Sequence, residues 1–213
     1  MMKYARPRLG VLILSVDLGV CLATVLEPFR HLFERMRMGT SALPERNLTD
    51  DELKLAANTL RRDVIDMLEK SKSGHPGGSL SAADIVATLF FSGVMKYNHN
   101  NPEDHTEDRF FLSKGHVAPV LYAAYHLLDW LHDEDMVTLR QLGSRLQGHP
   151  DCHACPGIEV CSGSLGQGLS VAAGCALGLS MDALASGERA KKVFVLLGDG
   201  ELQEGSNWEA CMF

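Results

Sequence analysis

The chain has 213 residues, a length that favours one domain with a short appendage. Apolar residues make up 46% of it and charged residues 22%, which are ordinary values for a globular protein and exclude a disordered chain. Lysine and arginine total 20 against 27 aspartates and glutamates, so the net charge is −7. We expect no general nucleic-acid binding from so acidic a chain, and an anionic ligand would need a local site.

Residues 1–45 differ in character from the rest. They contain an apolar run from Leu9 to Leu26 that follows basic residues and includes Asp17. Three interpretations remain open: a start assigned too far upstream, a genuine extension, or a secretory signal. As a membrane span the run is short and carries a charge, so we expect no membrane partner. Because the remaining sequence is typical of a cytoplasmic protein, we favour the first interpretation and leave residues 1–45 out of the predicted fold.

The predicted domain occupies residues 46–213 and alternates helices with short strands. Thr49 and Glu52 form a capping box, and apolar residues at helical spacing after it predict a helix over about 50–72. Ser73 and Gly74 end this helix, and Pro76 is expected to prevent its return. The other elements expected before residue 168 are a helix from the Ser81–Asp84 capping pattern to about Gly93, a strand over Arg109–Leu112, a helix after His116, a short helix over Asp133–Leu142 and a long loop over 148–168.

The last third of the chain indicates the fold class. Small residues from Gly168 to Gly178 predict a helix that approaches a neighbouring backbone closely. Val193–Leu197 is an apolar, partly β-branched run between charges and glycine, which is typical of a fully buried parallel strand. Helices that alternate with buried strands indicate a layered α/β fold.

Three histidines, His75, His116 and His149, each follow a glycine directly at the end of a predicted element. An imidazole can donate, accept and transfer protons near pH 7, and a neighbouring glycine lets a ligand approach closely. The alternative is that each histidine bonds only within its own loop. The three together leave the two interpretations evenly matched.

Two glycine-rich loops are candidate binding sites for a phosphate. Gly198-Asp199-Gly200 follows the predicted buried strand, where ligands of open α/β sheets bind, and a carboxylate there suits Mg²⁺. The pattern is neither a dinucleotide fingerprint nor a P-loop, because Gln203 and Ser206 stand at the required glycine and lysine. The loop 162–168 offers backbone donors at a helix N-terminus. In both loops, glycine needed for a turn alone remains the alternative.

Six cysteines are too few for a disulfide scaffold in a chain of this length. Cys152 and Cys155 form one C-x-x-C motif, with His149 just before it. A structural zinc site usually needs a second such pair, and the sequence has none. We therefore expect reduced loop cysteines, with metal binding as the alternative.

Five stretches of the chain form a recognisable set when they are taken in order. They are SKSGHPGGSLSAADI (71–85), DRFFLSKGHVAPVLYA (108–123), QGHPD (147–151), PGIEVCSGSLGQGLSVAAG (156–174) and VFVLLGDGELQEGSNWEA (193–210). Together they resemble the N-terminal, diphosphate-binding domain of transketolases, over about residues 48–213. Many full-length members have proline where this chain has Ser164, and in this respect the chain is most like the split bacterial form with separate N- and C-terminal subunits.

The resemblance implies a three-layer, parallel-sheet thiamine-diphosphate-binding fold. It implies transfer of a two-carbon ketol unit between sugar phosphates, in the pentose phosphate pathway of the cytoplasm, with thiamine diphosphate and Mg²⁺. The implied partner is a C-terminal subunit with the pyrimidine-binding domain, in a homodimer or heterotetramer. The implied residues are His75 and His149 for catalysis, His116, Gly163, Ser164, Leu165 and Gly200 for the cofactor, Asp199 for the metal, and Glu204 and Glu209 for a subunit interface with a proton relay.

Two departures from the family pattern bear on these expectations. Cys161-Ser162 replaces the usual Thr or Ser-Thr pair, a mild change because neighbouring backbone makes most of the contacts. The family's second metal ligand, an asparagine, and the last parallel strands would lie beyond Phe213. We therefore expect a C-terminally incomplete domain that is inactive alone. The alternatives are another thiamine-diphosphate enzyme of the superfamily or an inert scaffold.

Overall fold

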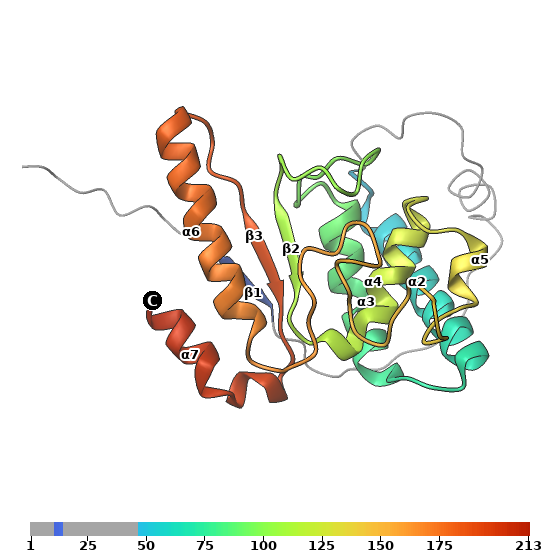
Figure 1. Ribbon diagram of the computed structural model, residues 1–213. Coiled ribbons are helices and arrows are strands. Elements are labelled where there is room, and N and C mark those ends of the chain that lie inside the picture. Colours follow the sequence, from blue (N-terminus) through green and yellow to red (C-terminus); the bar gives the residue numbers. More distant parts are fainter. Residues whose placement is uncertain (1–10, 15–46) are drawn as a thin grey trace, which may run out of the picture.

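The computed structural model describes residues 11–14 and 47–213 (Figure 1). The predictions made for residues 1–10 and 15–46 lie outside this part of the chain. The described elements are β1 (Val11–Leu14), α2 (Asp50–Ser71), α3 (Pro76–Phe91), β2 (Arg109–Leu112), the 3₁₀ helix η1 (Gly115–Val117), α4 (Ala118–Leu127), α5 (Asp133–Met136), α6 (Gly168–Ser186), β3 (Val193–Leu196), the 3₁₀ helix η2 (Gly200–Gln203) and α7 (Gly205–Met212).

The described strands form a parallel sheet in the order β1-β3-β2, so the late strand β3 lies in the middle. In its register, Arg109 of β2 lies opposite Val193, and Leu112 lies opposite Leu196. The sheet also includes a segment to which the sequence analysis assigns no part in the fold. Val11–Leu14 pairs along the other edge of β3, with Val11 opposite Val193.

Helices cover β2 and β3 from both faces because successive side chains of a strand point to opposite sides. Phe110 and Phe194 belong to the main core cluster with α2, α3 and α4. Phe111 and Val195 belong to a second cluster with Ala172 of α6. Figure 1 shows α6 and α2–α4 on opposite sides of the strands. Burial on both faces explains why β3 is a continuous apolar run rather than an alternating one. These observations confirm an α/β fold with a parallel sheet.

The predicted helix over 50–72 is confirmed as α2. Its N-terminal end has the expected local cause, whereas its C-terminal end is capped by Lys72 and not by the predicted Ser73 and Gly74. The Thr49 backbone N–H donates to Glu52 Oε2 at 2.8 Å, which completes the capping box. Lys72 follows in the left-handed conformation, with φ of 52°. The strand over Arg109–Leu112 is also confirmed, and β3 ends one residue earlier than predicted.

Two predicted helix boundaries are wrong. The helix expected from Ser81 begins at Pro76, because proline fits the first helical turn, where its missing N–H would have no partner. The helix expected over Asp133–Leu142 ends at Met136. Arg140 has a φ of 62°, and its backbone N–H donates to the Leu146 carbonyl at 2.8 Å, so this segment turns back as a loop.

Among the described residues, α6 is long and apolar enough to cross a membrane by length and composition alone. Its Leu169, Ala172 and Ala176 are instead buried in the cluster that covers β3. A core helix on a sheet passes the same test of length and composition. We therefore interpret α6 as the second covering layer of the sheet, as its small residues predict.

The loops at the carboxyl end of the sheet are joined by one buried side chain, Glu201, which is 2% exposed. Its Oε1 accepts hydrogen bonds from Ser113 Oγ at 2.5 Å and from the Gly166 backbone N–H at 2.8 Å. Its Oε2 accepts one from the Gly198 backbone N–H at 2.9 Å. A single carboxylate thus connects the loop after β2, the loop before α6 and the loop after β3.

We expect Glu201→Gln to lower the free energy of unfolding by about 1–3 kcal/mol, the usual cost of leaving a buried hydrogen-bonding group unsatisfied. An amide NH₂ cannot accept the Gly198 N–H, so two donors would face each other. Urea denaturation measures this change. Glu188→Gln, at an exposed position, is the matched control, and an equal loss in both variants would contradict the role of Glu201.

His126 of α4 joins two other helices through carboxylates. Its Nδ1 lies 3.1 Å from Asp63 Oδ2 on α2, and its Nε2 lies 3.0 Å from Asp133 Oδ1 on α5. Asp63 is 15% exposed and Asp133 is 85% exposed. The hydrogen bond with Asp63 raises the pKa of His126 above 6.5, against the opposing effect of burial, and the other interactions with Asp63 and Asp133 add to it.

A raised folded-state pKa makes stability depend on pH in one direction. The stabilisation is complete below the unfolded value of about 6.5 and is lost as pH rises through the folded value. We expect Asp63→Asn to flatten this loss in denaturation curves measured from pH 5.5 to 8.5. Asp133→Asn should leave most of this pH-dependent loss of stability in place, because water screens the Asp133 carboxylate. Equal effects of the two variants would contradict the assignment.

Candidate functional site

The candidate site lies where loops leave the carboxyl ends of β2 and β3. These ends meet at one edge because the strands are parallel. β2 leads into Ser113 and η1, and β3 leads into Gly198 and η2. The long loop before α6 joins them, held by Glu201.

The structure brings the three glycine-flanked histidines together. His75 caps α3, and its ring centroid lies 5.6 Å from that of His116 in an edge-to-face arrangement. His149 comes from the long loop and lies against Gly163, where an added Cβ would be 3.4 Å from His149 Cγ. His75 and His149 are exposed, and His116 is half-buried.

Burial lowers the pKa of His116, and the nearby His75, Lys114 and His149 lower it further, against the opposing charge of Glu201. His116 is therefore neutral near pH 7, with one ring nitrogen that donates and one that accepts. That state suits a contact with a ligand oxygen.

Sequence reasoning missed two charged residues at this edge of the sheet, Lys114 and Glu201. Lys114 is 5% exposed. Burial lowers its pKa, while the negative charges of Asp199 and Glu201 oppose that effect. A buried cation beside an exposed carboxylate is a suitable partner for an anion. The available signal was a charged residue within a few positions of the end of a buried strand, because such a position lies at the ligand-binding edge.

Glycine permits a close backbone contact between two loops of the site. A Cβ on Gly115 would lie 2.7 Å from Ser162 Oγ and 2.9 Å from the Gly163 nitrogen, so no larger residue fits without a shift. Ser162 Oγ is buried and has no hydrogen-bond partner in the described chain. Buried hydroxyls are normally satisfied, so this atom indicates a place where a bound group completes the site. The adjacent Ser164 and Leu165 are exposed.

The predicted metal and interface residues lie at the outer side of the same loops. Asp199 and Gly200 are exposed at the start of η2, with open space where a Cβ of Gly200 would be. Glu204 caps α7 and lies close to Gly166, and Glu209 is exposed on that helix. Both carboxylates face solvent, so a relay between them and a second subunit stays a prediction.

Comparison with known proteins matches most of the chain to one family. Residues 52–213 match the family model described as transketolase, thiamine diphosphate binding domain. The chain is 44% identical over 162 residues to a transketolase of Pongo abelii, covering 76% of this chain and 25% of that protein. It is 41% identical over 162 residues to the 6-deoxy-6-sulfo-D-fructose transketolase subunit SqwG of Clostridium sp. strain MSTE9, covering 76% of this chain and 57% of that subunit.

The solved structures agree. The crystal structure of transketolase from Campylobacter jejuni superposes with a TM-score of 0.69 at 38% identity, covering 77% of this chain and 26% of that one. The chain thus spans about a quarter of the full-length relatives and just over half of the subunit. The resemblance found in the sequence is confirmed: this chain belongs to the transketolase family, and residues 52–213 match its thiamine-diphosphate-binding domain.

Proposed function

We propose that this chain supplies the diphosphate-binding part of a transketolase that moves a two-carbon ketol unit between sugar phosphates. The observation that carries the proposal is the convergence of Lys114, His116 and Asp199 at the shared carboxyl end of β2 and β3. These are a buried cation, a neutral imidazole and an exposed carboxylate, and they suit a diphosphate with its Mg²⁺.

Each of these groups has a proposed task at the diphosphate. Asp199 offers a hard oxygen ligand to Mg²⁺, and the Gly200 backbone N–H is placed to donate to a phosphate oxygen. The Lys114 ammonium balances part of the remaining negative charge, and the neutral His116 ring can donate a hydrogen bond to a phosphate oxygen. The unpartnered Ser162 Oγ, the half-buried Gly163 and the exposed Ser164 and Leu165 extend the proposed cofactor contact along the loop.

His75 and His149 are proposed to act on the substrate. Thiamine diphosphate, when bound, supplies the carbanion stabilisation that breaks and forms the carbon–carbon bond. The protein's part is to orient the sugar and to hold or transfer protons at its hydroxyl and carbonyl oxygens. The two histidines suit this part because they are exposed beside the half-buried His116.

We further propose a three-layer parallel-sheet fold for the domain of this chain. We also propose a C-terminal partner subunit that contributes the pyrimidine-binding domain, in a homodimer or heterotetramer. Trp208 is 58% exposed and Met212 is 79% exposed on α7, the helix that also carries Glu209. Exposed apolar groups on one helix are typical of an interaction surface. The relatives extend beyond the matched region, and one of them is named a subunit.

The name of this relative bears on the choice of substrate. Its name places a sulfonated sugar among the substrates of its own reaction, so we propose assays of this chain's assembly with both a sugar phosphate and a sulfosugar.

The five described cysteines are free thiols, which supports the proposal of a reducing, cytoplasmic location.

We expect calorimetry to show weak Mg²⁺-dependent binding of thiamine diphosphate to the chain alone and stronger binding in the assembly with a C-terminal subunit. Asp199→Ala should weaken binding to the assembly by at least about 10-fold, because even lost outer-shell partners of a metal cost 10–100-fold. Asp182→Ala, an exposed carboxylate on α6, is the control. Unchanged affinity in Asp199→Ala would remove this residue from the metal, and micromolar binding to the chain alone would contradict the partner requirement.

We expect Glu204→Gln to slow activation of the assembled enzyme by the cofactor, because an amide cannot share or transfer the proposed interface proton. The lag before steady-state turnover, followed after addition of thiamine diphosphate and Mg²⁺, measures this step. Glu188→Gln keeps the same change of charge at an exposed site away from α7. An unaltered lag in Glu204→Gln would contradict the relay.

A further inference from the structure

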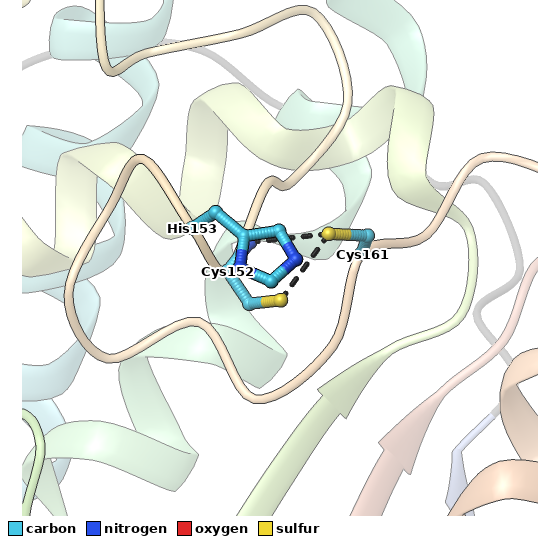
Figure 2. A group of neighbouring side chains, drawn as sticks. All are labelled: Cys152, His153 and Cys161. Carbon is cyan, nitrogen blue, oxygen red and sulfur yellow. Dashed lines mark hydrogen bonds between the residues drawn. The ribbon is translucent and has the colours of Figure 1, made fainter.

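The loop before α6 brings two thiols and an imidazole together at a point that the proposed function does not use. Cys152 Sγ lies 3.2 Å from Cys161 Sγ, and the Cys152 backbone N–H donates to Cys161 Sγ at 3.4 Å (Figure 2). The ligand atoms of Cys152, His153 and Cys161 all lie within 4.8 Å of one another. Figure 2 shows the His153 ring beside the two sulfurs.

This arrangement differs from the motif seen in the sequence, which pairs Cys152 with Cys155. The backbone N–H groups of Ala154 and Cys155 both donate to the Asp151 carbonyl, at 3.2 and 3.0 Å. The resulting tight turn places Cys155 in the core, 1% exposed, where burial raises the pKa of its thiol to about 12. Cys161 takes its place beside Cys152, because the Ser162 N–H donates to the Pro150 carbonyl at 3.3 Å and joins the two arms of the loop.

We propose that Cys152, His153 and Cys161 bind a Zn²⁺ ion. Two thiolates and one imidazole are a donor set that zinc prefers. Zn–S bonds of about 2.3 Å in a tetrahedral site place the two sulfurs about 3.8 Å apart, so the present pair would need to open by only about half an ångström. His153 and Cys161 are exposed, which leaves the ion a path of entry.

Asp151 borders this site on the side of Cys161. Its Oδ1 lies 3.4 Å from Cys161 Sγ and accepts a hydrogen bond from the His153 backbone N–H at 2.9 Å. The carboxylate therefore lies next to one proposed ligand and fixes the backbone of another, where it can orient a water molecule that fills the fourth position.

A cation accounts for the cluster better than a disulfide does. A disulfide would use the two sulfurs alone and leave the imidazole and the carboxylate at the same point without a role. Zinc binds cysteine as the thiolate, so its binding should release protons and strengthen as pH rises.

The proposed ion would join the two arms of the loop that frames the candidate site. One arm continues from His149 to Cys152, and the other continues from Cys161 to Gly163, which lies against His149. The thiolate ligands proposed here select zinc, whereas the carboxylate oxygen of Asp199 suits Mg²⁺, so the two sites prefer different metals. The proposed zinc ion would hold His149 in place whether or not a cofactor is bound.

The test uses the reduced, metal-free chain and Zn²⁺ alone, titrated against a chromophoric chelator. We expect one ion per chain, together with thiolate-to-metal charge-transfer absorption when Co²⁺ replaces Zn²⁺. Cys152→Ser combined with Cys161→Ser should weaken Zn²⁺ binding by about 100-fold or more and abolish the Co²⁺ band. His153→Ala, at an exposed position, should weaken Zn²⁺ binding as well.

Two matched variants show whether Zn²⁺ binding belongs to this cluster alone. Cys211→Ser removes an exposed thiol on α7 and should leave the stoichiometry and affinity unchanged. Asp199→Ala should also leave Zn²⁺ binding unchanged, so failure here and failure of the proposed function are distinguishable. Binding that survives the double cysteine substitution, no stoichiometric binding, or mass mapping that finds a Cys152–Cys161 disulfide with no metal affinity after reduction would overturn the proposal.

Discussion

The Glu201 carboxylate is the contact on which the candidate site depends. It is buried, and it accepts hydrogen bonds from Ser113, Gly166 and Gly198, which belong to three loops that are distant in sequence. A buried carboxylate needs such donors, and backbone N–H groups that leave a strand or approach a helix need acceptors. The carboxylate accepts from these N–H and hydroxyl groups, and each donor thereby gains its acceptor, so the hydrogen bonds hold the three loops together. His116, His149 and Asp199 are carried by the same loops.

The parallel sheet explains why those loops meet at all. β2 and β3 run side by side in register although α4, α5 and α6 lie between them in the chain. Parallel pairing requires a long crossover, and it places the carboxyl ends of both strands at one edge. The helices that cover the two faces exclude water from the strands and leave this edge open. The fold therefore sets the position of the chemistry, and the glycines decide how closely a ligand can approach.

Two kinds of ligand chemistry lie near each other in the loop region. Asp199, Lys114 and His116 offer a carboxylate, an ammonium and an imidazole, which suit a hard cation with a diphosphate. Cys152, Cys161 and His153 offer soft donors, which suit zinc. His149 and Gly163 lie between the two, because the arms that carry the thiols also carry these residues. Zinc bound at Cys152, His153 and Cys161 would thus fix the few residues of backbone that carry His149 and Gly163 beside the proposed diphosphate site.

The sequence by itself determined the features whose causes are local. The capping box at Thr49 and the apolar period after it specify α2, and the β-branched run at Val193 specifies a buried strand. The family also followed from sequence, since its motifs are contiguous stretches. Pro76 was misjudged because proline either ends a helix or begins one, and only packing against α2 and η1 distinguishes the two outcomes. Glu201, Lys114 and the Cys152–Cys161 pair were decided by tertiary structure alone. Their partners lie on other loops, and no spacing along the chain records which distant donor a buried group will meet.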